Sequence, residues 1–511
     1  MAKSVAVFDL GMTNKKAAVY DLDLRVVESR SRVFEPILID GIEAHDLVGI
    51  EEWLLDSLRE FSRDNEIGAI GVSTHGATLV CVGADGLPCV PCVYYTHEPG
   101  PDFHARFYRM AGRRDTLQKE TGTAGLSALV NPAKGLLFLK ERFPELFDKT
   151  VHVLNYAQYW GYRLTGLAGA DCTCTGVHTY LWDWRKEEYS SVARKLGVAS
   201  KLPLPIRAPW EVLGPLKDEL SLRCGLSGNA RVTMGIHDSN SSLLPHLLKS
   251  EGRDFVLNST GTWCVLMHPQ ERYGFSVDEL GKLVFFNRSA FNRPVKTAIF
   301  PGGLEYEAWS SLIMSTAGSP NDFPLRSGTL PMEIYRKILI ECKDFLLPEI
   351  IPGVGQFSGS MGRIVAGSVM LEPARLESGR YSLPAHCNCL WSMALLNLSL
   401  VIQTCVALRR VGLVAGTRVF TEGGFRHNED YIRLLSAVLP ENPVFVSDIA
   451  EASLFGCAIT AVAALSGIDP AGVSGRFNID YRRIEPIGAL EGFARYCDSF
   501  IERTSGEPFV S

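Results

Sequence analysis

The hydrophobic and polar positions of the N-terminal segment alternate between short apolar runs and turns. Residues 4–10 (SVAVFDL), 16–23 and 25–34 form three such runs, and GMTNK separates the first two. Runs of this length that end at glycine, asparagine or aspartate are typical of β-strands joined as hairpins. The pattern therefore predicts a three-stranded meander at the start of the chain.

The next segments combine a helical pattern with buried strands. Residues 47–64 repeat apolar side chains at helical spacing, and residues 67–73 (IGAIGVS) read as a strand buried on both faces. Residues 77–95 predict a hairpin that turns at ADG. Residues 133–165 predict two helical pieces that are broken near Pro144.

The second half of the chain repeats the opening arrangement. Residues 253–269 (RDFVLNSTGTWCVLMHP) form a strand, a turn rich in glycine and threonine, and a second strand, as residues 4–21 do. A chain of 511 residues is also too long for one compact core. We therefore expect two related α/β domains, an N-terminal domain over residues 1–248 and a C-terminal domain over residues 249–511.

Composition narrows the classes of partner. The chain is 46% hydrophobic and 21% charged, with a formal net charge of −6 and no long basic run. This balance argues against a nucleic acid or an anionic membrane as the main partner. The N-terminus lacks the pattern of a secretory signal, and no uninterrupted apolar run reaches the roughly 18 residues that span a bilayer. We expect a cytoplasmic protein.

The 13 cysteines are scattered along the chain. The two close clusters, CTC at 172–174 and HCNC at 386–389, carry C-x-C spacing, whereas zinc sites usually use wider pairs. We therefore interpret these residues as reduced structural thiols.

The segment MGIHDSNSSLLPHLL places His237 and Asp238 between a predicted strand (230–236) and a predicted helix (241–249). Burying aspartate and histidine without partners is costly, so the pair indicates a function. The residues alone leave three possibilities open: a metal-ligand pair, part of a Ser/His/Asp triad, or a lone catalytic base. A helix cap is the structural alternative, since aspartate, serine and asparagine all cap helices well.

The turn in FDLGMTNKK has the character of a phosphate-binding nest. Gly11 allows a tight turn with exposed N–H groups, Thr13 and Asn14 add donors, and Lys15 or Lys16 adds positive charge. Asp9 at the end of the strand could hold Mg²⁺ through water. An ordinary β-turn would show the same residues.

Two further glycine segments suggest ligand contacts in the second half. NSTGTWC offers Thr260, Gly261 and Thr262 in one turn, and Gly423 and Gly424 in TEGGFRHN would let a flat ligand lie against the backbone. Each segment could also be a plain turn. One glycine turn at the start of each half favours a phosphate clamp between the domains.

The segment GVSTHGATL nearly matches the G-x-S-x-G nucleophile elbow of hydrolases, with His75 in place of the last glycine. The elbow needs a helix after the turn, and here another strand-like run follows. We therefore expect His75 to hydrogen-bond a polar ligand and doubt that Ser73 is a nucleophile.

Taken in this order, the segments resemble the FGGY carbohydrate kinases of the actin/hexokinase/Hsp70 ATPase superfamily. FDLGMTNKK is similar to the family's first phosphate motif, STHGATLV to the sugar-contacting segment of xylulokinases, and GIHDSNSSL to the segment with the catalytic aspartate. NSTGTWCVL looks most like rhamnulokinases, and TEGGFRHNEDYIRLLSAVL resembles the adenosine loop and its helix. YYTHEPGPD departs from the W-x-D pattern of many pentulose kinases, and His237 stands where xylulokinases have glycine.

The resemblance implies two ribonuclease-H-like (actin-like ATPase) domains with a cleft between them. It also implies ATP-dependent transfer of the γ-phosphate to a hydroxyl of a ketose (a pentulose or deoxyketohexose) or a polyol. Asp238 would be the general base, Asp9 and Asp238 would lie near Mg²⁺, and His75 and Gly76 would line the sugar site. The residues implied to bind ATP are Gly11, Thr13, Asn14, Lys16, Thr260, Gly261, Thr262, Gly423, Gly424 and Asn428.

Two other functional classes stay open. One is a non-catalytic sugar or nucleotide sensor on the same fold, and the other is a serine hydrolase that uses Ser73 with His237 or His75. A small-molecule sugar is the expected partner, and a homodimer is the default oligomer. Within the motif, we expect Ser239 or Asn240 to cap the helix and His237 to be only a packing neighbour of the base.

Overall fold

The computed structural model describes residues 3–226, 229–316, 329–351, 353–357, 359–379 and 382–504. The chain divides into two compact units of mixed α/β structure. Unit 1 consists of Met1–Gly252, Pro269–Lys296 and Ile449–Ile479. Unit 2 consists of Arg253–His268, Thr297–Asp448 and Asp480–Ser511.

The main sheet of unit 1 has the strand order β13-β14-β6-β1-β2-β3, and β15 also pairs with β6. The predicted meander is confirmed, because β1, β2 and β3 pair antiparallel in sequence order. Strands β1, β14 and β15 all run parallel to β6. The bounds of these strands are β1 Lys3–Leu10, β2 Asn14–Asp21, β3 Val26–Val33, β6 Glu66–Thr74, β13 Val212–Pro215, β14 Arg231–Thr233 and β15 Ile236–His237.

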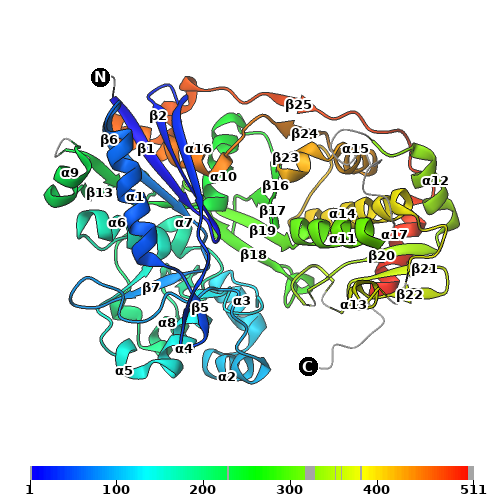
Figure 1. The fold of residues 1–511 in the computed structure, drawn as a ribbon, viewed down its shortest axis with the longest axis horizontal. Helices are drawn as coiled ribbons and strands as arrows, with labels where there is room; N and C mark the ends of the chain where they lie inside the picture. Colours follow the sequence, from blue (N-terminus) through cyan, green and yellow to red (C-terminus); the bar gives the residue numbers. More distant parts are fainter. Residues whose placement is uncertain are drawn as a thin grey trace. The chain divides into compact units, whose positions relative to one another are not determined.

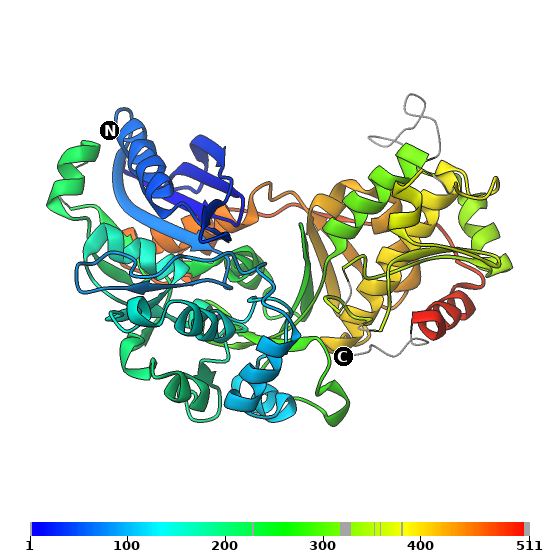
Figure 2. The same ribbon diagram turned by 60° about the horizontal axis from the view of Figure 1, so that its bottom comes forward.

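Helices that are far apart in the sequence cover the two faces of this sheet. Ala6 and Phe8 of β1 belong to the core under α1 (Leu47–Phe61), whereas Val5 and Val7 belong to the core under α16 (Ala452–Ser466). Alternate residues of a strand point to opposite faces, so β1 is buried on both sides. In Figures 1 and 2 the orange α16 lies against the blue N-terminal strands.

The predicted hairpin over residues 77–95 is wrong in its second strand. Strand β7 (Leu79–Val82) pairs antiparallel with β8 (His152–Asn155), and only an isolated bridge joins Val82 to Pro88. Proline has no N–H to donate to a ladder, so Pro88 and Pro91 prevent a continuous second strand.

Strand β8 also divides the region that was predicted as two helical pieces. The structure has three helices there, with the strand between the second and the third. The apolar residues before Tyr156 therefore form a strand that pairs with β7 and do not continue a helix. The helices of this part of unit 1 are α2 Pro101–Ala111, α3 Arg114–Thr121, α4 Pro132–Arg142, α5 Pro144–Phe147, α6 Tyr156–Thr165, α7 Cys172–Thr175, α8 Ser191–Leu196 and α9 Asp218–Cys224.

Unit 2 repeats the central arrangement of unit 1. Strands β16 and β17 form an antiparallel hairpin, and β23 runs parallel to β16 on its other side, as β6 does beside β1. The internal repeat seen in the sequence is therefore a repeat of strand pairing. The principal elements are β16 Phe255–Thr260, β17 Cys264–Pro269, α11 Gly302–Thr316, β20 Asp344–Leu347, β21 Arg363–Ala366, β22 Val369–Leu371, α14 Cys389–Arg410, β23 Arg418–Gly423, α15 Glu429–Val438, β24 Val444–Ser447 and α17 Phe493–Thr504.

Helix α14 is the central core helix of unit 2. By length and composition it resembles a membrane span, with a mean hydropathy of 1.7, but 89% of that stretch is buried inside the protein. It runs beside α11, as Figure 1 shows. Its apolar character is explained by packing in the core.

Helix α16 packs closely against α10 (Asp238–Lys249) at Gly456, where an added Cβ would lie 1.8 Å from the carbonyl oxygen of Ser241. We expect Gly456→Ala to lower the free energy of unfolding by roughly 3 kcal/mol, because neither backbone can yield without repacking. Urea unfolding measures this change. Gly135→Ala is the matched control in α4, where an added Cβ meets nothing within 4 Å. Equal losses in the two variants would contradict the prediction.

Candidate functional site

Three parallel strands of unit 1 end side by side and bring two predicted site residues together. Asp9 of β1 pairs with Ser73 of β6, and Ile236 of β15 pairs with the same Ser73. Helix α10 begins at Asp238, directly after β15. The negative charge of Asp238 contributes to the raised pKa of Asp9, as expected for neighbouring carboxylates.

Asp9 has one carboxylate oxygen in use and one without a partner. Its Oδ2 accepts a hydrogen bond of 2.6 Å from the hydroxyl of Ser453, whereas Oδ1 is buried and has no partner among the described residues. Burial, followed by the charge of Asp238, raises the pKa of Asp9 to about 6. Two neighbouring carboxylates with a spare oxygen suit a hard divalent cation, so these residues fit Mg²⁺.

Asp238 is held through one oxygen only. Oδ1 accepts hydrogen bonds from the Ser239 N–H at 2.6 Å and the Ser239 hydroxyl at 3.2 Å, and it lies 3.1 Å from His237 Nε2. No described residue hydrogen-bonds Oδ2, and the side chain is 32% exposed. Burial raises the pKa of this carboxyl to about 6. The geometry leaves Oδ2 able to accept a proton from a ligand.

The prediction that Ser239 or Asn240 caps the helix is wrong. The N-cap position is His237, which makes no side-chain capping bond, and α10 begins three residues earlier than the sequence predicted. Ser239 and Asn240 therefore lie inside the first turn. Ser239 donates to Asp238, and the Asn240 amide contacts His237.

His237 stands directly against Asp238, with its Nε2 3.1 Å from Asp238 Oδ1, and its role as a packing neighbour of the base stays a prediction. Its Nδ1 lies 2.9 Å from the Asn240 amide nitrogen, and burial lowers the pKa of His237 to about 3. The neutral ring therefore accepts from Asn240 at Nδ1, which leaves its proton on Nε2, 3.1 Å from Asp238 Oδ1. Its backbone N–H donates to the Thr173 hydroxyl at 2.9 Å.

His75 and Gly76, both predicted to contact a sugar, lie next to this group. A Cβ on Gly76 would stand 2.8 Å from His237 Cδ2, so only glycine allows the ring of His237 to approach this closely. The ring centroid of His75 lies 5.1 Å from that of Tyr95 and 5.7 Å from that of His45. Asp238 also contributes to the raised pKa of Tyr95.

His45 and His75 are buried and His178 is half-buried, and the ring nitrogens of all three are buried without a partner within the described part of the chain. Burial lowers the pKa of His45 and His178 to about 3 and that of His75 well below its usual value. A neutral imidazole offers one donor and one acceptor, which matches a hydroxyl group. Sequence reasoning missed His45, His178 and Tyr95, which stand in separate loops outside any motif.

The first glycine turn presents Lys16 toward Asp9. Strand pairing sets Lys16 opposite Asp9, and its Nζ lies 2.5 Å from Glu451 Oε2. Lys15 is fully buried, donates to the carbonyl of Met12, and has a pKa lowered to about 8 by burial. Opposite faces of β2 thus separate the two lysines, and only Lys16 shares the face of Asp9.

Of the remaining predicted residues of this turn, Gly11 and Thr13 lie between β1 and β2, and Asn14 is the first residue of β2. Thr13 and Asn14 are exposed, and Gly11 is partly buried. A Cβ on Gly11 would stand 2.9 Å from the carbonyl oxygen of Asn14, so a side chain there would crowd the turn.

In unit 2, Thr260 ties the second glycine turn to the glycine loop. Its hydroxyl donates to the carbonyl of Glu422 at 2.5 Å and accepts from the N–H of Phe425 at 2.9 Å. A Cβ on Gly423 would lie 1.9 Å from the carbonyl oxygen of Thr260, so this close approach requires glycine. Gly261, Thr262 and Gly424 are exposed.

The side chain of Asn428 is engaged in structural contacts. Its Oδ1 accepts from the N–H of Tyr431 at 3.0 Å and caps α15, and its Nδ2 donates to Asn397 Oδ1 at 2.9 Å. A contact with adenosine through this side chain stays a prediction.

The geometry gives no support to the hydrolase alternative. Ser73 lies inside β6, and the chain continues through a turn into β7. A nucleophile elbow requires a helix at that place.

Comparison with known proteins matches both halves of the chain. Residues 4–245 match the model described as "FGGY family of carbohydrate kinases, N-terminal domain", and residues 252–468 match "Carbohydrate kinase FGGY, C-terminal domain". A xylulose kinase of Bacillus subtilis is 27% identical over 30% of each chain. An L-fuculokinase of Salmonella typhi is 25% identical over 52% of this chain and 56% of the relative. The alignments thus span about a third to a half of these curated relatives.

Solved structures show the same fold over nearly the whole chain. A carbohydrate kinase from Novosphingobium aromaticivorans superposes with a TM-score of 0.77 at 24% identity, covering 98% of both chains. A gluconate kinase from Lactobacillus acidophilus gives a TM-score of 0.79 at 16% identity, covering 98% of this chain and 97% of that one.

The buried imidazoles predict a loss of stability in mild acid. The unfolded state binds a proton at His178 near pH 6.5, but the folded state binds it only near pH 3. Stability therefore falls as the pH drops below 6.5, by roughly 2 kcal/mol for this residue at pH 5. Urea unfolding at pH 7 and pH 5 measures the loss in the wild type and in His178→Gln. The variant is expected to lose less, and an equal loss would show that His178 does not carry the effect.

Proposed function

Since the chain belongs to the FGGY family of carbohydrate kinases, we propose that it transfers the γ-phosphate of ATP to a hydroxyl of an uncharged ketose or polyol. The carboxylate of Asp238 carries this proposal. One oxygen is fixed by two hydrogen bonds from Ser239 and lies 3.1 Å from His237 Nε2, and the other has no partner among the described residues. A fixed and partly exposed carboxylate is suited to orient and deprotonate an attacking hydroxyl.

The acceptor is proposed to be uncharged because three imidazoles in and near the predicted sugar site are neutral hydrogen-bonding groups. His45, His75 and His178 keep buried nitrogens without partners, and burial holds all three rings neutral. Such groups pair with hydroxyls and do not compensate a carboxylate or phosphate. A pentulose or a deoxyketohexose fits this character.

In the proposed reaction, Asp238 Oδ2 takes the proton of the attacking hydroxyl. The hydroxyl oxygen bonds to the γ-phosphorus, and the bond from that phosphorus to the bridging oxygen of ADP breaks. Transfer of this kind depends mainly on positioning and on neutralisation of charge. When bound, Mg²⁺ would supply that neutralisation and would be held by Asp9 and Asp238. His237 keeps the base oriented through Nε2.

The nucleotide is proposed to bind through the glycine turns of both units. Thr260 and Asn428 contribute through the backbone they hold in place, since their side chains already have partners. Cytoplasmic carbohydrate metabolism is the proposed setting. The other proposed ATP-binding residues are Gly11, Thr13, Asn14, Lys16, Gly261, Thr262, Gly423 and Gly424.

Asp238→Asn is expected to lower acceptor-dependent ADP release by about 100-fold or more, because the amide cannot take the proton. A coupled assay over uncharged ketoses and polyols measures the rate. Asp218→Asn is the matched control, since Asp218 also opens a helix (α9) of unit 1. Unchanged release in Asp238→Asn would remove Asp238 as the base. No release by the wild type with any acceptor would favour the sensor alternative.

His237→Ala is expected to lower kcat roughly tenfold with little change in KM for the acceptor. The variant loses the Nε2 group that stands 3.1 Å from the base, and a hydrogen bond formed there to a charged acceptor is worth about 1.5 kcal/mol. His237→Gln can restore a donor and is expected to recover most of the rate. Steady-state kinetics on the three proteins separates the two constants. Equal losses in both variants, or a change in KM alone, would contradict a positioning role.

A further inference from the structure

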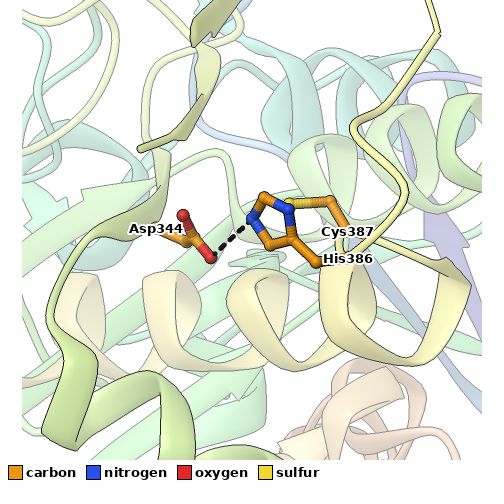
Figure 3. Close-up of side chains that lie close together, drawn as sticks. All are labelled: Asp344, His386 and Cys387. Atoms are coloured by element: carbon orange, nitrogen blue, oxygen red, sulfur yellow. Dashed lines mark hydrogen bonds and ion pairs between the residues drawn. The ribbon is translucent and has the colours of Figure 1, made fainter. Parts of the chain in front are cut away.

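Three side chains of unit 2 that belong to no part of the proposed site form a compact cluster. Asp344 opens β20, and His386 and Cys387 lie in the segment that leads into α14. One ligand atom from each lies within 4.8 Å of the other two. Figure 3 shows the His386 ring facing the Asp344 carboxylate, with the cysteine behind it. We refer to these three residues as the Asp–His–Cys cluster.

The separations suit one metal ion after small shifts of the side chains, since the His386–Asp344 pair must open slightly. His386 Nε2 is already 3.1 Å from Asp344 Oδ2. Ligand bonds of about 2.0–2.3 Å in a tetrahedral site place donor atoms roughly 3.4–3.8 Å apart. The His386 side chain is 48% exposed, so it can adjust while the other two stay in place.

The charge balance at Asp344 also favours a cation. This side chain is 1% exposed, and it pairs with His386, which carries a charge only when protonated. Its Oδ1 accepts from the N–H of Gly367 at 2.8 Å, and its Oδ2 accepts from Trp391 Nε1 at 3.1 Å. A buried carboxylate needs a counter-charge, and neutral donors do not supply one.

The neighbours of the cluster have the arrangement usual around metal ligands. Gly367 and Trp391 fix the carboxylate, much as outer hydrogen bonds orient ligating groups in metalloproteins. Cys387 is 1% exposed, whereas Cys389, two residues later, begins α14 and is outside the cluster. The structure thus separates the two cysteines that the sequence grouped as HCNC.

We infer that the Asp–His–Cys cluster binds a single borderline-soft divalent cation, of which Zn²⁺ is the representative. Mixed oxygen, nitrogen and sulfur donors favour Zn²⁺ over Mg²⁺ or Ca²⁺, which prefer oxygen alone. Cys387 loses its thiol proton on binding, and water completes the coordination on the exposed side of His386. The ion links the start of β20 to the entry of α14.

Co²⁺ tests this site in the full-length chain, because a cobalt–thiolate bond gives a near-ultraviolet charge-transfer band that oxygen ligands do not. Chelator-treated protein is titrated with Co²⁺. We expect the band to saturate at one ion per chain and to disappear when Zn²⁺ is added. The readout is independent of kinase activity and of Mg²⁺ bound near Asp9.

Cys387→Ser is expected to abolish the band, whereas Cys389→Ser, the matched control, keeps it. His386→Gln is expected to weaken Co²⁺ binding at least tenfold. Thermal unfolding tests the variants independently, since Zn²⁺ should raise Tm in the wild type and in Cys389→Ser but not in Cys387→Ser. A wild type without the band, or a band that persists in Cys387→Ser, would overturn the assignment.

Discussion

The parallel pairing of β1 and β15 with β6 is the constraint on which the chemistry of unit 1 depends. It fixes Asp9 beside the start of α10, where Asp238 follows β15 directly. A shift of β1 by one residue would turn Asp9 to the opposite face, where Ala6 and Phe8 pack under α1. The apolar alternation of β1 therefore maintains the register and places the carboxylate.

The two units share the same strand pairing, but different residues stand at the ends of the corresponding strands. In unit 1 the strand before the turn carries a carboxylate at its end, and Lys16 stands opposite it. In unit 2 the corresponding strand ends at Thr260, whose hydroxyl joins two segments of backbone. The same strand arrangement thus carries charged side chains at its end in unit 1 and a glycine-rich turn and loop in unit 2. The family assignment agrees with this division, since each half matches its own domain.

The sequence patterns predicted those elements whose formation depends on their own segment of the chain. The meander follows from periodicity because its strands pair with their neighbours in sequence, and α1 and β6 follow from the apolar patterns of their own segments. The partner of β7 could not be predicted, because β8 lies far along the chain and no local signal links them. The motif residues Asp9 and Asp238 were found from sequence, and their shared environment follows from strand register.

Site residues that come from separate loops could not be predicted from sequence patterns. His45, His178 and Tyr95 reach the surroundings of Asp238 from three different connections, and none belongs to a motif. Asp344 joins HCNC from 42 residues upstream of His386. The short distance from His237 Nε2 to Asp238 Oδ1 was also not predicted, because it depends on where α10 begins. Tertiary placement, and not residue type, decides such positions.

The position of α16 in the chain has a consequence for how the protein is made. Ser453 of this helix bonds to Asp9 across 444 residues, and α16 supplies the cover for one face of the first sheet. While the ribosome is still synthesising unit 2, that sheet face has no permanent partner. The nascent chain therefore exposes an apolar surface through most of its translation, a state in which chaperones bind and aggregation competes with folding.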